Sequence, residues 1–252
     1  MRKLLNYLTK PIGLELVKPL GVRSKARHQF LTYAYSQEGQ SPNRKLISLA
    51  LKAIERAFKE IIDTSGCNPQ APDFQHFNQY PGEHYRLLKA LSSCLAPKTV
   101  VEIGTYTGMG TTSIYQGLSE QSEIVTFDIV KWDSFETHLS SDVFNSRRIT
   151  QRLSDLSIEE NFVQFKSLLG KAELIFCDGP KNGRFEAAFL HLLKTLPADE
   201  GLRILMLDDI HFPNMIDLWR SIRSPKLDIT SFGHFSGTGL VDLSGGLELS
   251  PD

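Results

Sequence analysis

Two patterns of apolar and polar positions alternate along this chain. One predicts β-strands and the other predicts α-helices. Short apolar runs rich in β-branched residues predict buried strands. They lie at 99–103, 123–128, 147–151, 172–178 and 203–208, followed by shorter ones at 227–232 and 239–243. Apolar residues at helical spacings separate the first six runs, at 110–119, 133–141, 157–169, 184–195 and 214–222. The chain therefore alternates strand and helix over most of its length.

This alternation predicts an α/β fold with a doubly wound, mostly parallel sheet. The crossover connections should be right-handed, with helices on both faces of the sheet. The last two strands, at 227–232 and 239–243, have no helix between them. They predict an antiparallel hairpin at one edge.

A separate helical pattern precedes the sheet. Its apolar residues recur at spacings of three and four, which predicts an amphipathic helix. We expect the apolar stripe of this helix to be a packing surface. The stripe consists of Ile47, Leu51, Ile54, Phe58 and Ile61. Residues 64–82 are rich in Pro, Asn, Gln and Gly and predict a loop or boundary. We therefore predict a helical appendage over 1–80 and the main domain over 81–252.

Composition narrows the class of protein. No apolar run approaches the ~20 residues that span a bilayer, and three cysteines are too few for a disulfide framework or a zinc site. Cytoplasmic residence is the default expectation. The net charge of −1 argues against nucleic acid as a partner. Residues 1–30 are nevertheless basic, and we interpret them as a solvated lead-in, with an arm that touches an anionic surface or partner as the alternative.

Residues 99–113 join a strand, a glycine loop and a helix start. Gly104, Gly108 and Gly110 allow a sharp turn and close backbone approach. The helix N-terminus that follows offers free N–H groups to a polar or anionic ligand. Ligands of open parallel sheets bind past the carboxyl ends of the strands. Carboxylates lie at or beside these strand ends in Glu102, Asp128, Asp155, Asp178, Asp208 and Asp209.

Two features decide which ligand the glycine loop favours. Asp128 lies 24 residues after Gly104, at a strand tip where a carboxylate can accept both hydroxyls of a ribose. The glycines, however, are spaced G-x-x-x-G-x-G rather than the dinucleotide G-x-G-x-x-G. Glu102 precedes the loop, where it would repel a pyrophosphate and suit a cation. This favours S-adenosylmethionine, a sulfonium amino acid, over NAD.

The stretch Glu-Ile-Gly-Thr-Tyr-Thr-Gly-Met-Gly resembles motif I of class I S-adenosylmethionine-dependent methyltransferases, and in particular the catechol O-methyltransferase-like family, with its aromatic at Tyr106. The resemblance covers about residues 80–243. It implies a Rossmann-like seven-stranded sheet with the last strand antiparallel. The cofactor-binding residues it implies are Glu102, Gly104, Thr105, Tyr106, Gly108, Thr111, Asp128, Ile129, Ser154, Asp155 and Asp178. A helix N-cap is an equally good interpretation of Ser154 and Asp155.

Two further stretches resemble the metal site of that family. Asp178-Gly179-Pro180-Lys181 is similar to its D-x-x-K, in which the aspartate binds metal and the lysine is the general base. Asp208-Asp209 stands where the family has Asp-Asn, and is similar to the pair in macrolide and aminocoumarin sugar O-methyltransferases. The resemblance thus implies Mg²⁺ or another divalent cation on Asp178, Asp208 and Asp209. It also implies catalytic roles for Asp178 and for Lys181, whose pKa would have to fall through desolvation.

The sequence therefore predicts O-methylation of a small hydroxylated molecule. Three alternatives stay open at this point: a methyltransferase that uses no metal, an NAD-dependent oxidoreductase, and a non-catalytic cofactor-binding domain whose basic N-terminal arm binds a partner. A homodimer is compatible with the sequence. His84, His211 and Trp219 are candidates for a pocket wall, although a lone His or Trp is more often structural.

Overall fold

The computed structural model describes residues 39–139, 141–144, 148–199 and 201–250. The basic residues of 1–30 lie outside the described residues. The chain from Gln40 onward forms one compact unit, to which the fold below belongs. The boundary at residue 80 stays a prediction. No helix in the described part of the chain has the length and apolar character needed to cross a membrane.

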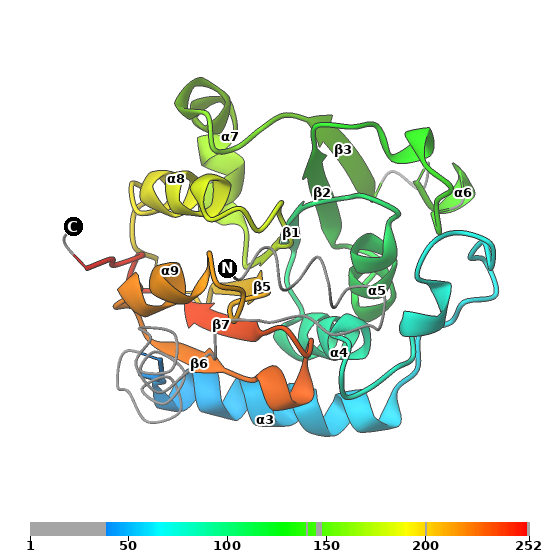
Figure 1. Cartoon of the computed structure of the whole chain (residues 1–252), viewed down its shortest axis with the longest axis horizontal. Helices are drawn as coiled ribbons and strands as arrows, with labels where there is room; N and C mark the ends of the chain where they lie inside the picture. Colours follow the sequence, from blue (N-terminus) through cyan, green and yellow to red (C-terminus); the bar gives the residue numbers. More distant parts are fainter. Residues whose placement is uncertain (1–38, 140, 145–147, 200, 251–252) are drawn as a thin grey trace, which may run out of the picture. The chain divides into compact units, whose positions relative to one another are not determined.

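Seven strands form one mixed sheet (Figure 1). They are β1 (Thr99–Ile103), β2 (Glu123–Asp128), β3 (Ile149–Leu153), β4 (Leu174–Cys177), β5 (Ile204–Asp208), β6 (Lys226–Asp228) and β7 (Thr238–Asp242). Their order is β3-β2-β1-β4-β5-β7-β6. The first five pair in parallel, and β7 is antiparallel to both β5 and β6. The predicted sheet and its antiparallel edge are confirmed.

Helices cover both faces of this sheet (Figure 1). The α-helices are α3 (Arg44–Lys59), α4 (Tyr85–Leu95), α5 (Met109–Gly117), α6 (Ser141–Phe144), α7 (Glu159–Lys171), α8 (Arg184–Leu193) and α9 (Ile216–Ser221). Short 3₁₀ turns are η2 (Phe74–His76), η3 (Trp132–Ser134) and η4 (Thr230–Phe232). Residues of α3, α4 and α5 share one core cluster with the strands. On the other face, Phe165 of α7 contacts Phe127 of β2, and Phe162 of α7 contacts Phe189 of α8.

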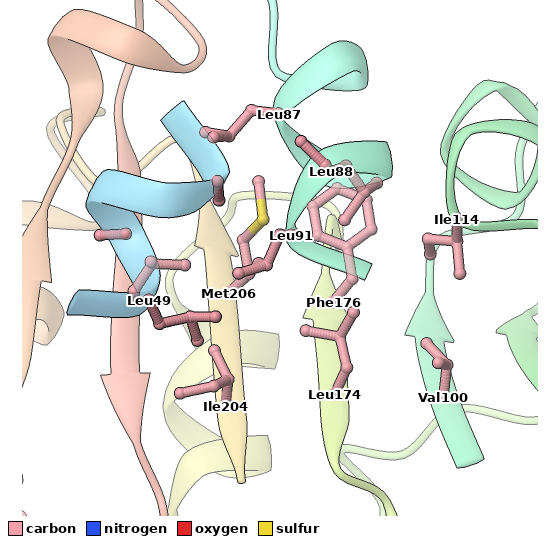
Figure 2. Packing of buried hydrophobic residues seen from close by; sticks show 14 of the residues in the cluster. Leu49, Leu87, Leu88, Leu91, Val100, Ile114, Leu174, Phe176, Ile204 and Met206 are labelled. Carbon is pink, nitrogen blue, oxygen red and sulfur yellow. The ribbon is translucent and has the colours of Figure 1, made fainter. Parts of the chain in front are cut away.

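Figure 2 shows the core on the α3–α4–α5 face. Leucines of α3 and α4 lie over the apolar side chains of the central strands, and the labelled residues are Leu49, Leu87, Leu88, Leu91, Val100, Ile114, Leu174, Phe176, Ile204 and Met206. All of these are less than a tenth exposed. Each fully buried Leu or Ile contributes roughly 1.5–3 kcal/mol. Because both faces are covered, the central strands are buried along nearly their whole length.

The predicted stripe on α3 is wrong as the packing face. The buried residues of this helix are Leu46, Leu49, Ala50, Ala53 and Ala57. Leu51 of the predicted stripe is 62% exposed, and Ile47, Phe58 and Ile61 are also exposed. Alanines let the helix axis approach the rest of the core closely, which larger side chains would prevent. The helix also begins one residue after its N-cap Asn43, whose side chain accepts the N–H of Leu46 at 2.8 Å.

The helix predicted over 133–141 is wrong. Residues 132–134 form the 3₁₀ turn η3, and residues 135–139 after it belong to no helix or strand. The N–H of His138 donates to the carbonyl of Thr107 at 2.8 Å, and Thr137 Oγ1 donates to the same carbonyl at 3.0 Å. These bonds to a distant loop replace the i to i−4 bonds that a helix would require.

Candidate functional site

A cavity of about 670 Å³ opens at the carboxyl ends of the strands. It lies where the strand order reverses between β1 and β4, the usual ligand position in such sheets. Its lining residues are Asp73, His76, Glu83, His84, Tyr85, Ile103, Gly104, Tyr106, Phe127, Asp128, Ile129, Val130, Ser154, Asp155, Asp178, Gly179, Pro180, Lys181, Phe185, Asp208 and His234. The volume is typical of a small-molecule site.

The glycine loop forms one wall of this cavity. Gly104 has φ +99°, and a Cβ there would lie 2.1 Å from the carbonyl oxygen of Asp178. The loop backbone thus touches the end of β4. Gly108 has φ +82°, and its Cα lies against the side chain of Leu139. Both positions need glycine, because other residues rarely adopt this conformation and have no room here.

Asp128, at the end of β2, is anchored beside the loop. Its Oδ2 accepts the N–H of Tyr106 at 2.9 Å, and its Oδ1 accepts the N–H of Val130 at 3.0 Å. Each oxygen keeps a further lone pair for a ligand hydroxyl. Ile129 follows in the cavity wall and is largely exposed. The carboxylate is therefore held in place before any ligand arrives.

Ser154 and Asp155 also line the cavity. Asp155 Oδ1 accepts the N–H of Ser157 at 2.9 Å and its hydroxyl at 2.6 Å. The helix α7 begins later, with Ile158 at its N-cap position and no side-chain cap. Asp155 therefore forms a turn before the helix rather than the N-cap itself.

Glu102 lies behind the glycine loop and is fully buried. Its Oε2 accepts the hydroxyl of Thr111 on α5, and a Cβ on Gly110 would lie 2.4 Å from its Oε1. The third glycine of the motif thus makes room for this carboxyl group. Burial raises the pKa of Glu102 to about 8, and hydrogen bonds from Thr111 and Thr126 only partly oppose that rise. Glu102 does not line the cavity.

Lys181 stands among the three predicted metal ligands. Its Nζ donates to Asp178 Oδ1 and lies 3.5 Å from Asp208 Oδ2 and 3.1 Å from Asp209 Oδ2. The carboxylate of Glu186 on α8 holds the surrounding loop by accepting the N–H of Lys181 at 2.7 Å. Lys181 and Asp209 both have positive φ, at 53° and 57°. Strained backbone of this kind concentrates at functional sites.

The charges in this cluster reinforce one another. Burial by itself would lower the pKa of Lys181, but Asp178, Asp208 and Asp209 outweigh it and raise that pKa well above its usual range. Burial would raise the pKa of Asp208, but His84, His234 and Lys181 hold it well below its usual range. Lys181 thus remains an ammonium ion across neutral pH, opposite to the direction that a base role requires.

Replacing Lys181 with methionine should lower the free energy of unfolding by about 3 kcal/mol near pH 8, because buried carboxylates lose their cation. The raised pKa of Lys181 means that its stabilisation is complete below pH 10.5 and lost only in stronger alkali. The lowered pKa values of Asp208 and Asp209 mean that their stabilisation is lost as the pH falls below 3.8. The difference between variant and wild type should therefore shrink in acid. Urea unfolding in the presence of a chelator measures it.

Lys131→Met is the matched control for that experiment. Lys131 pairs with Asp133 at 2.6 Å on the surface, and such pairs contribute less than about 1 kcal/mol. If Lys181→Met is as stable as Lys131→Met at pH 8, the ammonium does not neutralise the carboxylates.

Two histidines complete the cluster, and the sequence patterns missed His234. His84 precedes α4 and is 2% exposed, with Nδ1 3.3 Å from Asp208 Oδ1. His234 precedes β7, with Nδ1 3.3 Å from Asp208 Oδ1 and 3.2 Å from Asp209 Oδ1. Burial would lower the pKa of His234, but the two carboxylates raise it to about 10. The motif match offered no signal for His234, which only the tertiary fold brings to the strand ends.

The structure brings most of the predicted residues to one cavity and places others behind it. The cavity is lined by Gly104, Tyr106, Asp128, Ile129, Ser154, Asp155, Asp178, Lys181 and Asp208. Glu102, Thr105, Gly108, Thr111 and Asp209 are not in its lining. Trp219 is buried against Gly239 and so has a structural position rather than one in the cavity wall. His211 borders a different groove. The roles of all these residues stay predictions.

Residues 101–210 match the model of a family described as a methyltransferase domain. No curated protein matches the chain significantly in sequence. Similar solved structures include a methyltransferase from Geobacter sulfurreducens (18% identity, TM-score 0.42, 66% of this chain and 78% of that one). Others are an SAH-bound methyltransferase from Podospora anserina (17%, 0.43, 90% and 99%) and a protein from Corynebacterium glutamicum (14%, 0.46, 90% and 99%). The fold itself is established by the strand order β3-β2-β1-β4-β5-β7-β6.

Proposed function

We propose that this chain, whose residues 101–210 match the model of a methyltransferase domain, transfers a methyl group from S-adenosylmethionine to a hydroxyl of a small molecule, assisted by a divalent cation. One observation carries this proposal. A single cavity holds Asp128, anchored at the end of β2, together with Asp178 and Asp208 at the ends of β4 and β5. The carboxylate that we assign to the ribose and the cluster that we assign to the cation thus lie in one cavity.

The charge of the cavity supports a cationic cofactor. Its wall contains six carboxylates, from Asp73, Glu83, Asp128, Asp155, Asp178 and Asp208, which outnumber its cationic side chains, Lys181 and three histidines. Such a field opposes a pyrophosphate and attracts a sulfonium ion, which favours S-adenosylmethionine over NAD. S-adenosylmethionine supplies an electrophilic methyl carbon on its charged sulfur. Asp128 is the residue we assign to the ribose hydroxyls, and the apolar side chains of Ile129, Val130 and Phe185 offer a surface for the adenine.

The carboxylates of Asp178, Asp208 and Asp209 also fit a divalent cation. In this structure the Lys181 ammonium is their common cation, and it stands in for a metal ion. Three carboxylates suit Mg²⁺, which takes oxygen ligands. A divalent cation bound there would lower the pKa of an acceptor hydroxyl. Asp178 and Asp208 line the cavity, so they can orient a substrate, whereas Asp209 lies outside the lining.

We propose Lys181 as the general base only when another cation lies among the carboxylates. It can accept a proton only after its ammonium has lost one, and three carboxylates oppose that loss. The base role therefore requires another cation among the carboxylates. Most of the rate enhancement would come from holding the acceptor hydroxyl and the methyl donor in line.

The test uses the purified full-length chain. Calorimetric titration with S-adenosylhomocysteine should show one binding site per chain. Methyl transfer from radiolabelled S-adenosylmethionine to a panel of small catechols, phenols and sugars should occur and should stop when a chelator is added. If neither S-adenosylmethionine nor S-adenosylhomocysteine binds, the proposal is overturned. Turnover that persists in the chelator would assign the chain to the metal-independent methyltransferases instead.

Asp128→Asn should weaken S-adenosylhomocysteine binding by about 10–100-fold. The variant loses the charge that strengthens two hydrogen bonds to the ribose, each contributing roughly 1.5–3 kcal/mol when one partner is charged. Asp133→Asn is the matched control, because Asp133 lies five residues on and outside the cavity lining. Calorimetry measures both. Equal affinity in the Asp128→Asn variant and the wild type would remove Asp128 from the cofactor site.

A further inference from the structure

The geometry points to a second kind of metal centre, in which His84, His234 and Asp208 bind a divalent transition metal ion of the zinc class. It rests on the proposed function for its role in catalysis, but it shares only Asp208 with the three-carboxylate site and takes a different metal. Asp208 uses its two oxygens on two sides. Its Oδ2 faces the Lys181 ammonium, and its Oδ1 faces the two imidazoles. The nitrogen ligands lie only on the Oδ1 side.

The spacing of the three donor groups fits one ion. One ligand atom from each residue lies within 4.8 Å of the others. The Nδ1 atoms of His84 and His234 are each 3.3 Å from Asp208 Oδ1. In tetrahedral zinc sites, bonds of about 2.1 Å place neighbouring ligand atoms about 3.4 Å apart. The two measured separations already have this value.

His84 and Asp208 lack the hydrogen bonds that their burial demands. Each is 2% exposed, and both ring nitrogens of His84 and the Oδ1 of Asp208 have no hydrogen-bond partner. The 3.3 Å contact between them is close, yet it is not aligned as a hydrogen bond. A buried polar group without a partner costs about 1–3 kcal/mol. A metal ion between them would give a partner to His84 Nδ1 and to Asp208 Oδ1.

The backbone holds the two histidines together. Gly82 and His234 form an isolated parallel bridge, in which the Gly82 N–H donates to Gly233 O at 3.1 Å and the Phe235 N–H donates to Gly82 O at 3.0 Å. The segment before α4 and the segment before β7 are therefore tied beside the end of β5. Ligands held on such a frame require little ordering when an ion binds.

Glu83 supplies the outer carboxylate that metal-binding histidines usually have. Its Oε2 lies 3.6 Å from His234 Nε2, so its charge favours a proton on Nε2, while Nδ1 faces Asp208. Ser236 Oγ lies 2.8 Å from this Nδ1, and a metal ion would replace that hydrogen bond. Two imidazoles and one carboxylate suit divalent transition metals such as zinc, whereas three carboxylates suit Mg²⁺. All three ligand residues line the 670 Å³ cavity, which gives an ion a path and leaves open positions for a substrate oxygen.

The experiment measures metal binding without activity. Tag-free full-length protein, stripped with a chelator, is titrated with Zn²⁺ by calorimetry and with Co²⁺ by visible absorption. The wild type should bind one ion and develop cobalt bands. His84→Asn and His234→Asn should each lose at least about 100-fold in affinity, since even outer residues of metal sites cost 10–100-fold. His191→Asn, on the exposed surface of α8, is the matched control and should bind as the wild type does. Asp178→Asn should retain zinc.

Several results would overturn the site. They are a wild type that binds neither Zn²⁺ nor Co²⁺, binding that survives in both histidine variants, and binding that depends on Asp178 but not on the histidines. The first would mean that protonated histidines simply neutralise Asp208. If His84→Asn does not fold by circular dichroism, the more exposed His234→Asn decides. S-adenosylhomocysteine titrated into the same samples separates the two proposals. A protein that binds zinc but not S-adenosylhomocysteine supports this site and overturns the proposed function. A protein that binds S-adenosylhomocysteine but not zinc overturns this site alone.

Discussion

Replacing Gly104 with alanine is expected to destabilise the protein by roughly 5 kcal/mol and to reduce S-adenosylhomocysteine affinity at least 100-fold in any folded fraction. Two costs add. The φ of +99° is one that side chains rarely adopt, which costs about 1–3 kcal/mol. The new Cβ would also lie 2.1 Å from the carbonyl oxygen of Asp178, a backbone atom that cannot turn away. The ends of β1 and β4 would have to separate, and both carry groups of the cavity.

Gly170→Ala is the control for that substitution. Gly170 lies in the last turn of α7, where an added Cβ would meet nothing within 4 Å and the backbone has no positive φ. Alanine should stabilise there by about 0.5–1 kcal/mol, because it restricts the unfolded chain. Urea unfolding and calorimetry measure both variants. A Gly104→Ala protein with wild-type stability and affinity would show that the loop does not approach β4 this closely.

Glu102→Gln is expected to stabilise the protein by on the order of 4 kcal/mol at pH 8.5. Burial raises the pKa of Glu102 from 4.5 to about 8, so the folded state holds a proton that the unfolded state releases. The stability that this group contributes is complete below pH 4.5 and is lost as the pH rises to about 8. Each pKa unit is worth about 1.4 kcal/mol. Glutamine cannot titrate, so the variant escapes the loss.

The control is Glu136→Gln, at an exposed position. Chemical unfolding from pH 4.5 to pH 8.5 should give parallel curves for Glu136→Gln and the wild type, whereas the Glu102→Gln curve should rise above them as the pH increases. Parallel curves for all three would mean that Glu102 ionises in the folded protein as it does in water. Cofactor titration of the same variant tests the predicted contact of Glu102, because a group that supports the loop from behind affects affinity less than one that touches the ligand.

Strand positions could be read from the sequence because their signal is local. Six of the seven strands begin and end within two residues of the apolar runs that predicted them, among them β2 at Glu123–Asp128. A strand buried on both faces is apolar wherever it lies in the sheet, so the pattern needs no knowledge of its neighbours. The same holds for the glycine loop, whose turn is set by the residues within it.

Predictions failed where a neighbour distant in the sequence decides the outcome. The packing face of α3 is the one with alanines at positions 50, 53 and 57, because close approach to the core mattered more than the size of the apolar side chains. The segment around His138 bonds to the carbonyl of Thr107 instead of forming a helix. Neither preference is visible in the local period of apolar residues.

The sequence by itself determined the parallel sheet, its antiparallel edge, the glycine loop and the carboxylates at the strand ends. Each of these depends on residues near one another in the chain. Only the tertiary structure decided what surrounds the carboxylates. Because β7 inserts between β5 and β6, the segment that carries His234 reaches Asp208 and meets His84 across the Gly82 bridge. Lys181 meets Asp208 and Asp209 only because β4 and β5 are neighbours. The charge states of these groups follow from these contacts, because burial and opposite charge act through space and not along the chain.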